Sequence, residues 1–155
     1  MNTLLVYYSR TGTTKKVAEA ITKNLNCQVE EILSVKDRKG AMGYIVSGKE
    51  ATMKTPAEIE ETKIDSAQFD CVIIGTPIWA WNVSSPVRAY LVANKGKFKK
   101  VAFFCTQGGS GDSRAFLEME KICAVKPESS LTLLTKEVVV GDFEEKVKDF
   151  CRGLK

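Results

Sequence analysis

Strand-like and helix-like segments alternate along this chain, and this alternation restricts the folds that it can adopt. Apolar runs at residues 3–8, 69–75 and 100–105 have the composition of strands that are buried on both faces. Weaker strand patterns lie at residues 27–33 and within 130–139, and a segment with apolar residues at helical spacing follows each of the five. Such alternation predicts an α/β fold with a parallel sheet, right-handed crossovers and helices on both faces.

The helical signals differ in strength. The first helix is predicted over about residues 13–25, and the last one within residues 143–154, each with an apolar face. Residues 37–50 also show helical spacing, but three glycines weaken that prediction. Residues 52–68 are expected to form a polar connector.

The composition is that of a globular domain. The chain has 155 residues, of which 44% are hydrophobic and 27% charged, which predicts one domain over residues 1–155 with a substantial core. No apolar run approaches the length of a membrane span, and the first residues have a strand pattern instead of a signal-peptide layout. We therefore expect a cytoplasmic protein that does not bind membranes.

The residues that usually carry catalysis are scarce. There is no histidine, which removes Ser–His and Cys–His nucleophiles and the commonest metal ligand. The five cysteines are odd in number and form no C-x-x-C pair, so free thiols in a reducing compartment are expected. We predict no catalytic side chain and no metal site, and any chemistry is expected to belong to a bound cofactor.

Positive charge is in slight excess. The formal net charge is +4, and the densest basic cluster contains Lys95, Lys97, Lys99 and Lys100. This cluster precedes a predicted strand, whereas ligands of open parallel sheets bind beyond the carboxyl ends of the strands. The cluster is therefore expected at the opposite rim, as a solvated loop, and no nucleic-acid partner is predicted.

The loop after the first strand is rich in hydroxyl groups. It holds four of them and one glycine within six residues, Ser9, Arg10, Thr11, Gly12, Thr13 and Thr14. Gly12 allows a tight turn, and the free amides of the helix that follows can face an anion. Helix capping needs only one hydroxyl, so capping alone is the weaker explanation. The loop is predicted to bind a phosphate group, although it matches neither the nucleotide P-loop nor the dinucleotide glycine motif.

The loops after the other two long strands offer different chemistry. The second contains Thr76, Pro77, Ile78, Trp79, Trp81 and Asn82, and the third begins with Thr106, Gln107, Gly108 and Gly109. Because the carboxyl ends of parallel strands meet at one edge, all three loops are expected to converge there. Aromatic residues can form a wall of a ligand site, and glycines let the backbone approach the ligand. Taken singly, the tryptophans could be core residues and the glycines a mobile loop, but their coincidence favours a site.

These loops resemble those of the flavodoxin family. The resemblance rests on Ser-x-Thr-Gly-x-Thr at residues 9–14, Gly-Thr-Pro-Ile-Trp at 75–79, Ser-Pro-Val-Arg at 85–88 and Thr-x-Gly-Gly-Ser-Gly at 106–111. Residues 37–44 are also similar to that family. The resemblance implies a flavodoxin-like three-layer sandwich, whose five-stranded parallel sheet has the strand order 2-1-3-4-5.

The resemblance also implies a cofactor and the way it is bound. The cofactor would be FMN, with its ribityl phosphate in the first loop and its isoalloxazine ring between the second and third loops. Trp79 is expected to pack against the ring, with Trp81 as the alternative. Flavodoxins usually have an acidic surface near the flavin and a tyrosine in the loop after the fourth strand, but this chain is net basic and has no aromatic residue in that loop. One face of the ring is therefore expected to be open.

Three functions are compatible with these residues. The resemblance favours a flavodoxin-like electron carrier that shuttles electrons between redox partner proteins, a reductase and an acceptor. An open flavin face leaves an FMN-dependent NAD(P)H:quinone or flavin reductase as the alternative, although no nicotinamide-nucleotide motif is recognisable. A non-redox module that binds another phosphorylated ligand is the second alternative. These residues do not determine whether the protein is an enzyme, and they do not indicate its oligomeric state.

Overall fold

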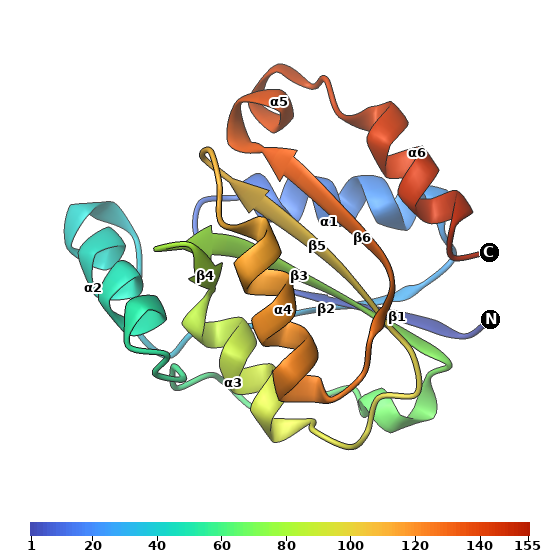
Figure 1. Ribbon diagram of the computed structural model, residues 1–155, viewed down its shortest axis with the longest axis horizontal. Coiled ribbons are helices and arrows are strands. Elements are labelled where there is room, and N and C mark those ends of the chain that lie inside the picture. Colours follow the sequence, from blue (N-terminus) through green and yellow to red (C-terminus); the bar gives the residue numbers. More distant parts are fainter.

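A parallel sheet forms the middle layer of the molecule. The computed structural model describes residues 1–155 and places five parallel strands in the order β2-β1-β3-β5-β6 (Figure 1). The parallel strands are β1 (Thr3–Tyr7), β2 (Gln28–Glu31), β3 (Cys71–Trp79), β5 (Val101–Gln107) and β6 (Pro127–Leu134). A short sixth strand, β4 (Asn82–Val83), pairs antiparallel with the end of β3. Numbered among the parallel strands alone, this is the 2-1-3-4-5 order expected from the sequence.

Helices cover both faces of the sheet, as Figure 1 shows. One face carries α1 (Thr13–Asn24), α5 (Thr135–Val140) and α6 (Glu144–Arg152), and the other carries α3 (Ser85–Ala93) and α4 (Asp112–Cys123). The helix α2 (Gly40–Thr52) stands at one end of the molecule, and a single 3-10 turn, η1 (Ser66–Gln68), precedes β3. The three-layer α/β sandwich is thereby confirmed, and so is the weakly signalled helix within residues 37–50.

The core is divided by the sheet into two apolar clusters. Leu4 and Val6 of β1 pack toward α3 and α4, whereas Leu5 and Tyr7 pack toward α1, α5 and α6. This alternation follows from the pleat of a strand, which points successive side chains to opposite faces. Every residue of β1 is buried, so the continuous apolar run at the start of the chain does mark a strand that is covered on both sides.

Two segments differ from the expectation. β3 continues to Trp79, beyond residue 75, because β5 pairs with it as far as Pro77 and β4 pairs with its last two residues. The second loop is consequently short and tight. β6 begins at Pro127 and ends at Leu134, and the apolar residues that follow, which had a strand pattern, form the short helix α5 instead.

The basic cluster and the cysteines lie away from the carboxyl edge of the strands or inside the core. Lys95, Lys97, Lys99 and Lys100 are exposed between α3 and the amino end of β5, at the rim where they were expected. All five cysteines are unpaired. Burial raises the pKa of Cys105 to about 12, so that thiol stays protonated and unreactive at neutral pH. No helix has the length and apolar character needed to cross a bilayer.

Gly75 allows the central strands to pack closely. A Cβ atom on Gly75 would come within 2.0 Å of the Cζ atom of Phe104, whose ring is fully buried in the cluster facing α1. Glycine is therefore required here for space, since no other residue leaves room for that ring. Gly48 in α2 is the opposite case, because a Cβ atom there would meet nothing within 4 Å.

We expect Gly75→Ala to lower the free energy of unfolding by about 1–3 kcal/mol, because the methyl group overpacks the core. The matched control Gly48→Ala should raise it by about 0.5–1 kcal/mol, since alanine is the better helix former. Urea denaturation followed by far-UV circular dichroism measures both. Equal effects of the two substitutions would contradict this account of the core.

Candidate functional site

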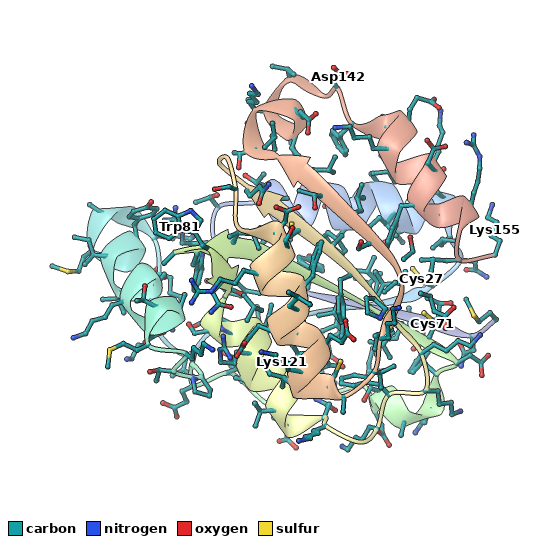
Figure 2. All side chains as sticks on the ribbon, viewed as in Figure 1. Cys27, Cys71, Trp81, Lys121, Asp142 and Lys155 are labelled. Atoms are coloured by element: carbon teal, nitrogen blue, oxygen red, sulfur yellow. The ribbon has the colours of Figure 1, made fainter.

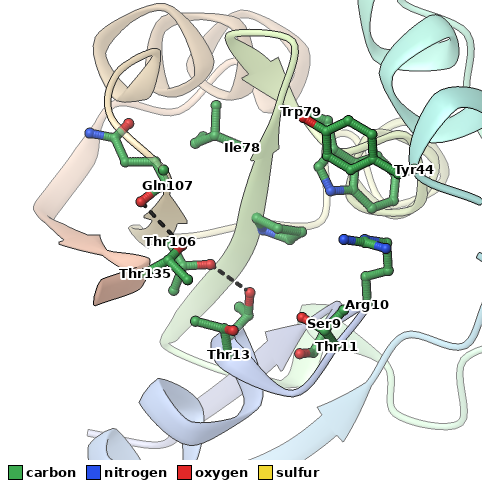
Figure 3. Close-up of a pocket in the computed structure, with 13 residues that line it drawn as sticks. Ser9, Arg10, Thr11, Thr13, Tyr44, Ile78, Trp79, Thr106, Gln107 and Thr135 are labelled. Carbon is green, nitrogen blue, oxygen red and sulfur yellow. Dashed lines mark hydrogen bonds between the residues drawn. The ribbon is translucent and has the colours of Figure 1, made fainter. Parts of the chain in front are cut away.

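The carboxyl ends of β1, β3 and β5 enclose a cavity of about 250 Å³ (Figure 3). All three predicted loops contribute to it, so they converge as expected from the parallel topology. α2 and the start of α5 complete the wall. The lining residues are Ser9, Arg10, Thr11, Thr13, Thr14, Tyr44, Pro77, Ile78, Trp79, Thr106, Gln107, Gly108 and Thr135.

A second, more apolar cavity of about 490 Å³ borders the first, with which it shares Tyr44, Ile78 and Trp79. It lies between α2 and the β3–β4 hairpin. Its other lining residues are Ile45, Gly48, Lys49, Thr52, Ala80, Trp81, Gly109 and Ser110. The predicted residues Trp81 and Gly109 therefore lie at this second cavity, while Gly12 lines a polar hollow beside Ser9, Arg10 and Thr11.

Two predicted residues lie outside all of these cavities. The Thr76 hydroxyl donates to Ser84 Oγ at 3.0 Å and accepts from the Ser84 amide at 3.1 Å. Asn82 Oδ1 accepts from the Val83 amide at 2.8 Å and from Arg88 Nη2 at 3.3 Å. Both side chains are buried. They shape the β3–β4 hairpin from behind instead of facing the cavity.

The hydroxyls of the first loop divide into two pairs. Ser9 Oγ accepts hydrogen bonds from the amides of Gly12 at 3.0 Å and Lys15 at 3.2 Å, and thus holds the loop closed. Thr14 Oγ1 is buried and lies 2.9 Å from Thr106 Oγ1, which ties this loop to the third one. The hydroxyls of Thr11 and Thr13 form no hydrogen bond within the chain, and each lines the cavity. These two are therefore free to bind a ligand.

The start of α1 is prepared for an anion. Gly12 is the N-cap residue, with φ 100°, and the first turn of the helix holds no acidic residue. Ser9 Oγ takes up only the third amide of the helix, that of Lys15. The amides of Thr13 and Thr14 have no hydrogen-bond partner within the chain. The Arg10 guanidinium adds a positive charge to the same cavity and lies 5.5 Å from the centre of the Tyr44 ring. Free amides, a helix dipole and a cation together favour a bound phosphate.

The two tryptophans have different surroundings. Trp79 is only 6% exposed, because the Tyr8 ring packs against it edge-to-face at 5.5 Å and the Arg38 guanidinium lies 5.4 Å from its centre. Trp81 is 62% exposed, and its Nε1 donates to Ser110 Oγ at 3.2 Å. Trp79 thus forms the floor between the cavities, whereas Trp81 presents an open indole face at the edge.

The third loop approaches the hairpin closely and leaves backbone donors free. A Cβ atom on Gly111, where φ is 111°, would lie 2.6 Å from the Trp81 Cα atom, so only glycine permits this approach. The amides of Gly108 and Gly109 have no partner within the chain. Gln107 is occupied, since its side chain accepts from the Asp112 amide at 3.0 Å and its carbonyl accepts from Thr135 Oγ1 at 3.2 Å.

The comparison with known families settles the relationship of the chain. The family model for flavodoxins matches residues 2–148. The chain belongs to the flavodoxin family. No protein of curated function matches it.

Solved structures share this flavodoxin fold. The FMN complex of a flavoprotein from Lactobacillus acidophilus is 23% identical, with a TM-score of 0.74 over 90% of this chain and 97% of that chain. The FMN complex of general stress protein 14 from Treponema denticola is 16% identical, with a TM-score of 0.57 over 100% of both chains. The two-electron reduced flavodoxin from Megasphaera elsdenii is 17% identical, with a TM-score of 0.61 over 99% of both chains.

The residues that sequence reasoning missed come mainly from α2. Tyr44 borders both cavities, and Ile45 and Lys49 line the second. Their segment was noted only as a weak helix that is similar to the flavodoxin family, and nothing in its spacing indicated which side faces the site. Thr135 was missed because it lies in a stretch that had a strand pattern.

In this member of the flavodoxin family, a buried ion pair holds α2 against the rest of the molecule. Arg38 is 3% exposed, and its Nη2 lies 2.5 Å from Glu50 Oε2, which also accepts from Ser85 Oγ at 2.7 Å. Burial alone would raise the pKa of Glu50, but hydrogen bonds from Ser85 and Arg38 hold that pKa below its usual value. A Cβ atom on Gly43 would lie 2.2 Å from the Arg38 carbonyl carbon, so the helix passes directly over this arginine.

We expect Glu50→Gln to lower the free energy of unfolding at neutral pH by about 3 kcal/mol, because Arg38 would stay buried without a countercharge. The folded-state pKa of Glu50 is depressed, so its contribution is present above the unfolded value of about 4.3 and is lost as the pH falls through the folded value. The variant should therefore lose less stability than the wild type on acidification.

Urea denaturation at neutral and acidic pH measures both effects. Glu58→Gln is the control, since Glu58 is exposed and belongs to no ion pair. If Glu50→Gln behaved like Glu58→Gln at neutral pH, the buried pair would not hold α2 in place.

Proposed function

We propose that this protein binds FMN and carries electrons between redox proteins. One observation carries the proposal. The hydroxyls and amides at the start of α1 that have no partner in the chain lie beside a cavity that two tryptophans line, and the first turn of α1 holds no acidic residue. A ligand with a phosphate at one end and a planar ring at the other matches this arrangement. The FMN complex of the Lactobacillus acidophilus flavoprotein, which shares the fold, supports the assignment.

The residues present fit each part of FMN. Thr11, Thr13 and the amides at the start of α1 would hold the phosphate, with Arg10 as a countercharge. Trp79 and Trp81 would provide the apolar walls for the ring. Of the two, Trp81 has the free indole face that stacking requires, so it replaces Trp79 as our choice for the stacking residue.

The protein's own part in the chemistry would be binding and orientation. FMN, when bound, supplies one- and two-electron transfer. The free amides of Gly108 and Gly109 are placed to donate hydrogen bonds to a ring edge. No carboxylate lines either cavity. Glu50 and Glu118 are each engaged by an arginine, at 2.5 and 2.9 Å. This arrangement favours electron transfer without acid–base catalysis by a side chain.

An FMN-dependent reductase is the second candidate, and a specific observation favours it. The cavity of about 490 Å³, in which the ring would lie, is apolar and extends to the exposed Trp81, so a second planar molecule could approach the ring from that side. NAD(P)H could then deliver hydride to the flavin and a quinone could accept it. The absence of a recognisable nicotinamide-nucleotide motif keeps this candidate second.

We expect FMN to bind at least about a hundredfold more tightly than riboflavin, because riboflavin lacks the phosphate and each charge-assisted hydrogen bond is worth about 1.5–3 kcal/mol. Thr11→Ala should lower the affinity for FMN about tenfold to a hundredfold, as expected for the loss of one such hydrogen bond, and leave the affinity for riboflavin unchanged. Flavin fluorescence quenching measures these affinities. Thr55→Ala, at an exposed threonine outside the cavities, is the control. Equal affinities for FMN and riboflavin would refute the phosphate site.

A second experiment separates the carrier from the reductase. We expect NADPH alone to reduce the FMN-loaded protein slowly, and a catalytic amount of an NADPH-dependent flavodoxin reductase to accelerate this strongly. Anaerobic stopped-flow absorbance follows the reaction, and dithionite establishes that all of the flavin is reducible. Fast reduction by NADPH alone, with a rate that saturates, would reject the carrier in favour of the reductase.

A further inference from the structure

The helix α2 is amphipathic in the reverse sense. Gly43, Ser47 and Ala51 form its buried side, and Glu50 is held there by Arg38. Large apolar side chains point outward instead, with Met42 at 72% and Ile45 at 61% exposure. A surface helix normally buries its apolar residues and exposes its polar ones. The chain itself therefore leaves the outer side of α2 uncovered. Ile45 lines the second cavity, whereas Met42 lines none of the cavities described above.

The exposed apolar residues of α2 form one continuous stripe. Met42, Ile45 and Met53 lie on one side of the helix together with Lys49, since the four residues follow one another at intervals of three and four. Met53, directly after the helix, is 65% exposed. We call these four residues the α2 face.

The α2 face adjoins the candidate cofactor site. Ile45 and Lys49 line the second cavity together with Trp81, which is 62% exposed. Figure 2 shows Trp81 beside α2, and Figure 1 shows α2 at one end of the molecule. Contiguous apolar patches of this kind mark interaction sites, whereas single exposed apolar residues do not. A molecule seated on the α2 face would reach the mouth of the site.

The charges around the α2 face are mainly positive. Segment 36–54 contains five basic residues and two acidic ones. Arg38 and Lys36 pair with Glu50, and Lys54 pairs with Glu118 of α4 at 3.3 Å. Lys39 and Lys49 are exposed and form no ion pair. Asp37 is the one remaining carboxylate of the segment. The partner that complements this rim carries carboxylates.

We propose that the α2 face docks a redox partner protein whose contact surface is apolar at its centre and acidic at its rim. The inference rests on the proposed function, because the partner would exchange electrons through the adjoining site. A second copy of the chain is a poorer match, since a twofold contact through this face would bring the lysines of both copies together.

Rubredoxin, a small acidic iron–thiolate protein, serves as the probe, and basic cytochrome c as its opposite. Binding is read from amide NMR shifts with and without FMN, so it stays measurable even if the cofactor assignment fails. Electron transfer from the reduced FMN protein to each probe is followed by absorbance. We expect rubredoxin to shift amides of α2, to bind more tightly than cytochrome c, and to lose affinity as salt rises.

Substitutions then locate the surface. Met42→Ser combined with Met53→Ser should lower the affinity for rubredoxin about tenfold. The affinity for FMN should not change, because neither methionine lines a cavity. Lys49→Glu should also lower the affinity for rubredoxin and make that affinity less dependent on salt. The matched controls are Val140→Ser, at a residue 76% exposed on α5, and Lys95→Glu, at the opposite rim.

Several outcomes would overturn the inference. Equal affinity for the two probes would contradict an acidic partner. Equal effects of Lys49→Glu and Lys95→Glu would show that the α2 face is not the binding surface. Concentration-dependent self-association that Met42→Ser abolishes would assign the face to a second copy. Binding to phosphatidylglycerol vesicles that Met42→Ser abolishes would assign it to a membrane surface.

Discussion

Burial of β1, β3 and β5 on both faces is the constraint from which the rest of the structure follows. Such strands are typical of parallel sheets with helical crossovers, and here β1, β3 and β5 do run parallel, so their carboxyl ends share one edge. Each of these strands ends in a loop that is too polar or too tight to continue the sheet. The three loops therefore meet at one place, although about 100 residues of sequence separate the first from the third. The position of the cavity therefore follows from the topology of the sheet and does not depend on any single contact.

The hydrogen bonds inside that edge determine which groups stay available. The contact of 2.9 Å between the hydroxyls of Thr14 and Thr106 joins the first loop to the third, and Ser9 closes the first loop on itself. The hydrogen bonds of these groups fix the loops in place. Thr11, Thr13 and the glycine amides retain theirs, so a ligand would meet donors that are already in position. Little reorganisation would then accompany binding, which is how preorganised sites gain affinity.

Much of the fold was predictable from local patterns, and much of the site was not. The long apolar strands and the flanking helices follow from periodicity, since burial on two faces leaves a clear record in a short stretch of sequence. The hydroxyl-rich loop was recognisable for the same reason, because its hydroxyls and glycine are adjacent in the chain; that it binds a phosphate group stays a prediction. That the side chains of Thr76 and Asn82 are buried away from the cavities was not predictable, because the direction of a side chain in a tight hairpin depends on pairing with β4, which local sequence does not report.

The position of α2 was the hardest part to foresee. Its inner side is made of small residues around the buried Arg38–Glu50 pair, so its hydrophobic pattern indicates the wrong face. Only the long-range contacts of Arg38 with Trp79 and of Glu50 with Ser85 reveal which side is attached. Periodicity assumes that apolar residues mark the interior, and it fails where a polar pair anchors the helix.

The close packing of Gly75 against Phe104 has a consequence for how this chain can change over evolution. The aromatic ring fills the space that any side chain at position 75 would need, so the two positions share one volume. A larger residue at 75 is tolerable only alongside a smaller one at 104, and either change alone passes through a strained or a hollow intermediate. Among relatives of this chain the two positions should therefore be exchanged as a pair, and the size of one should report the size of the other.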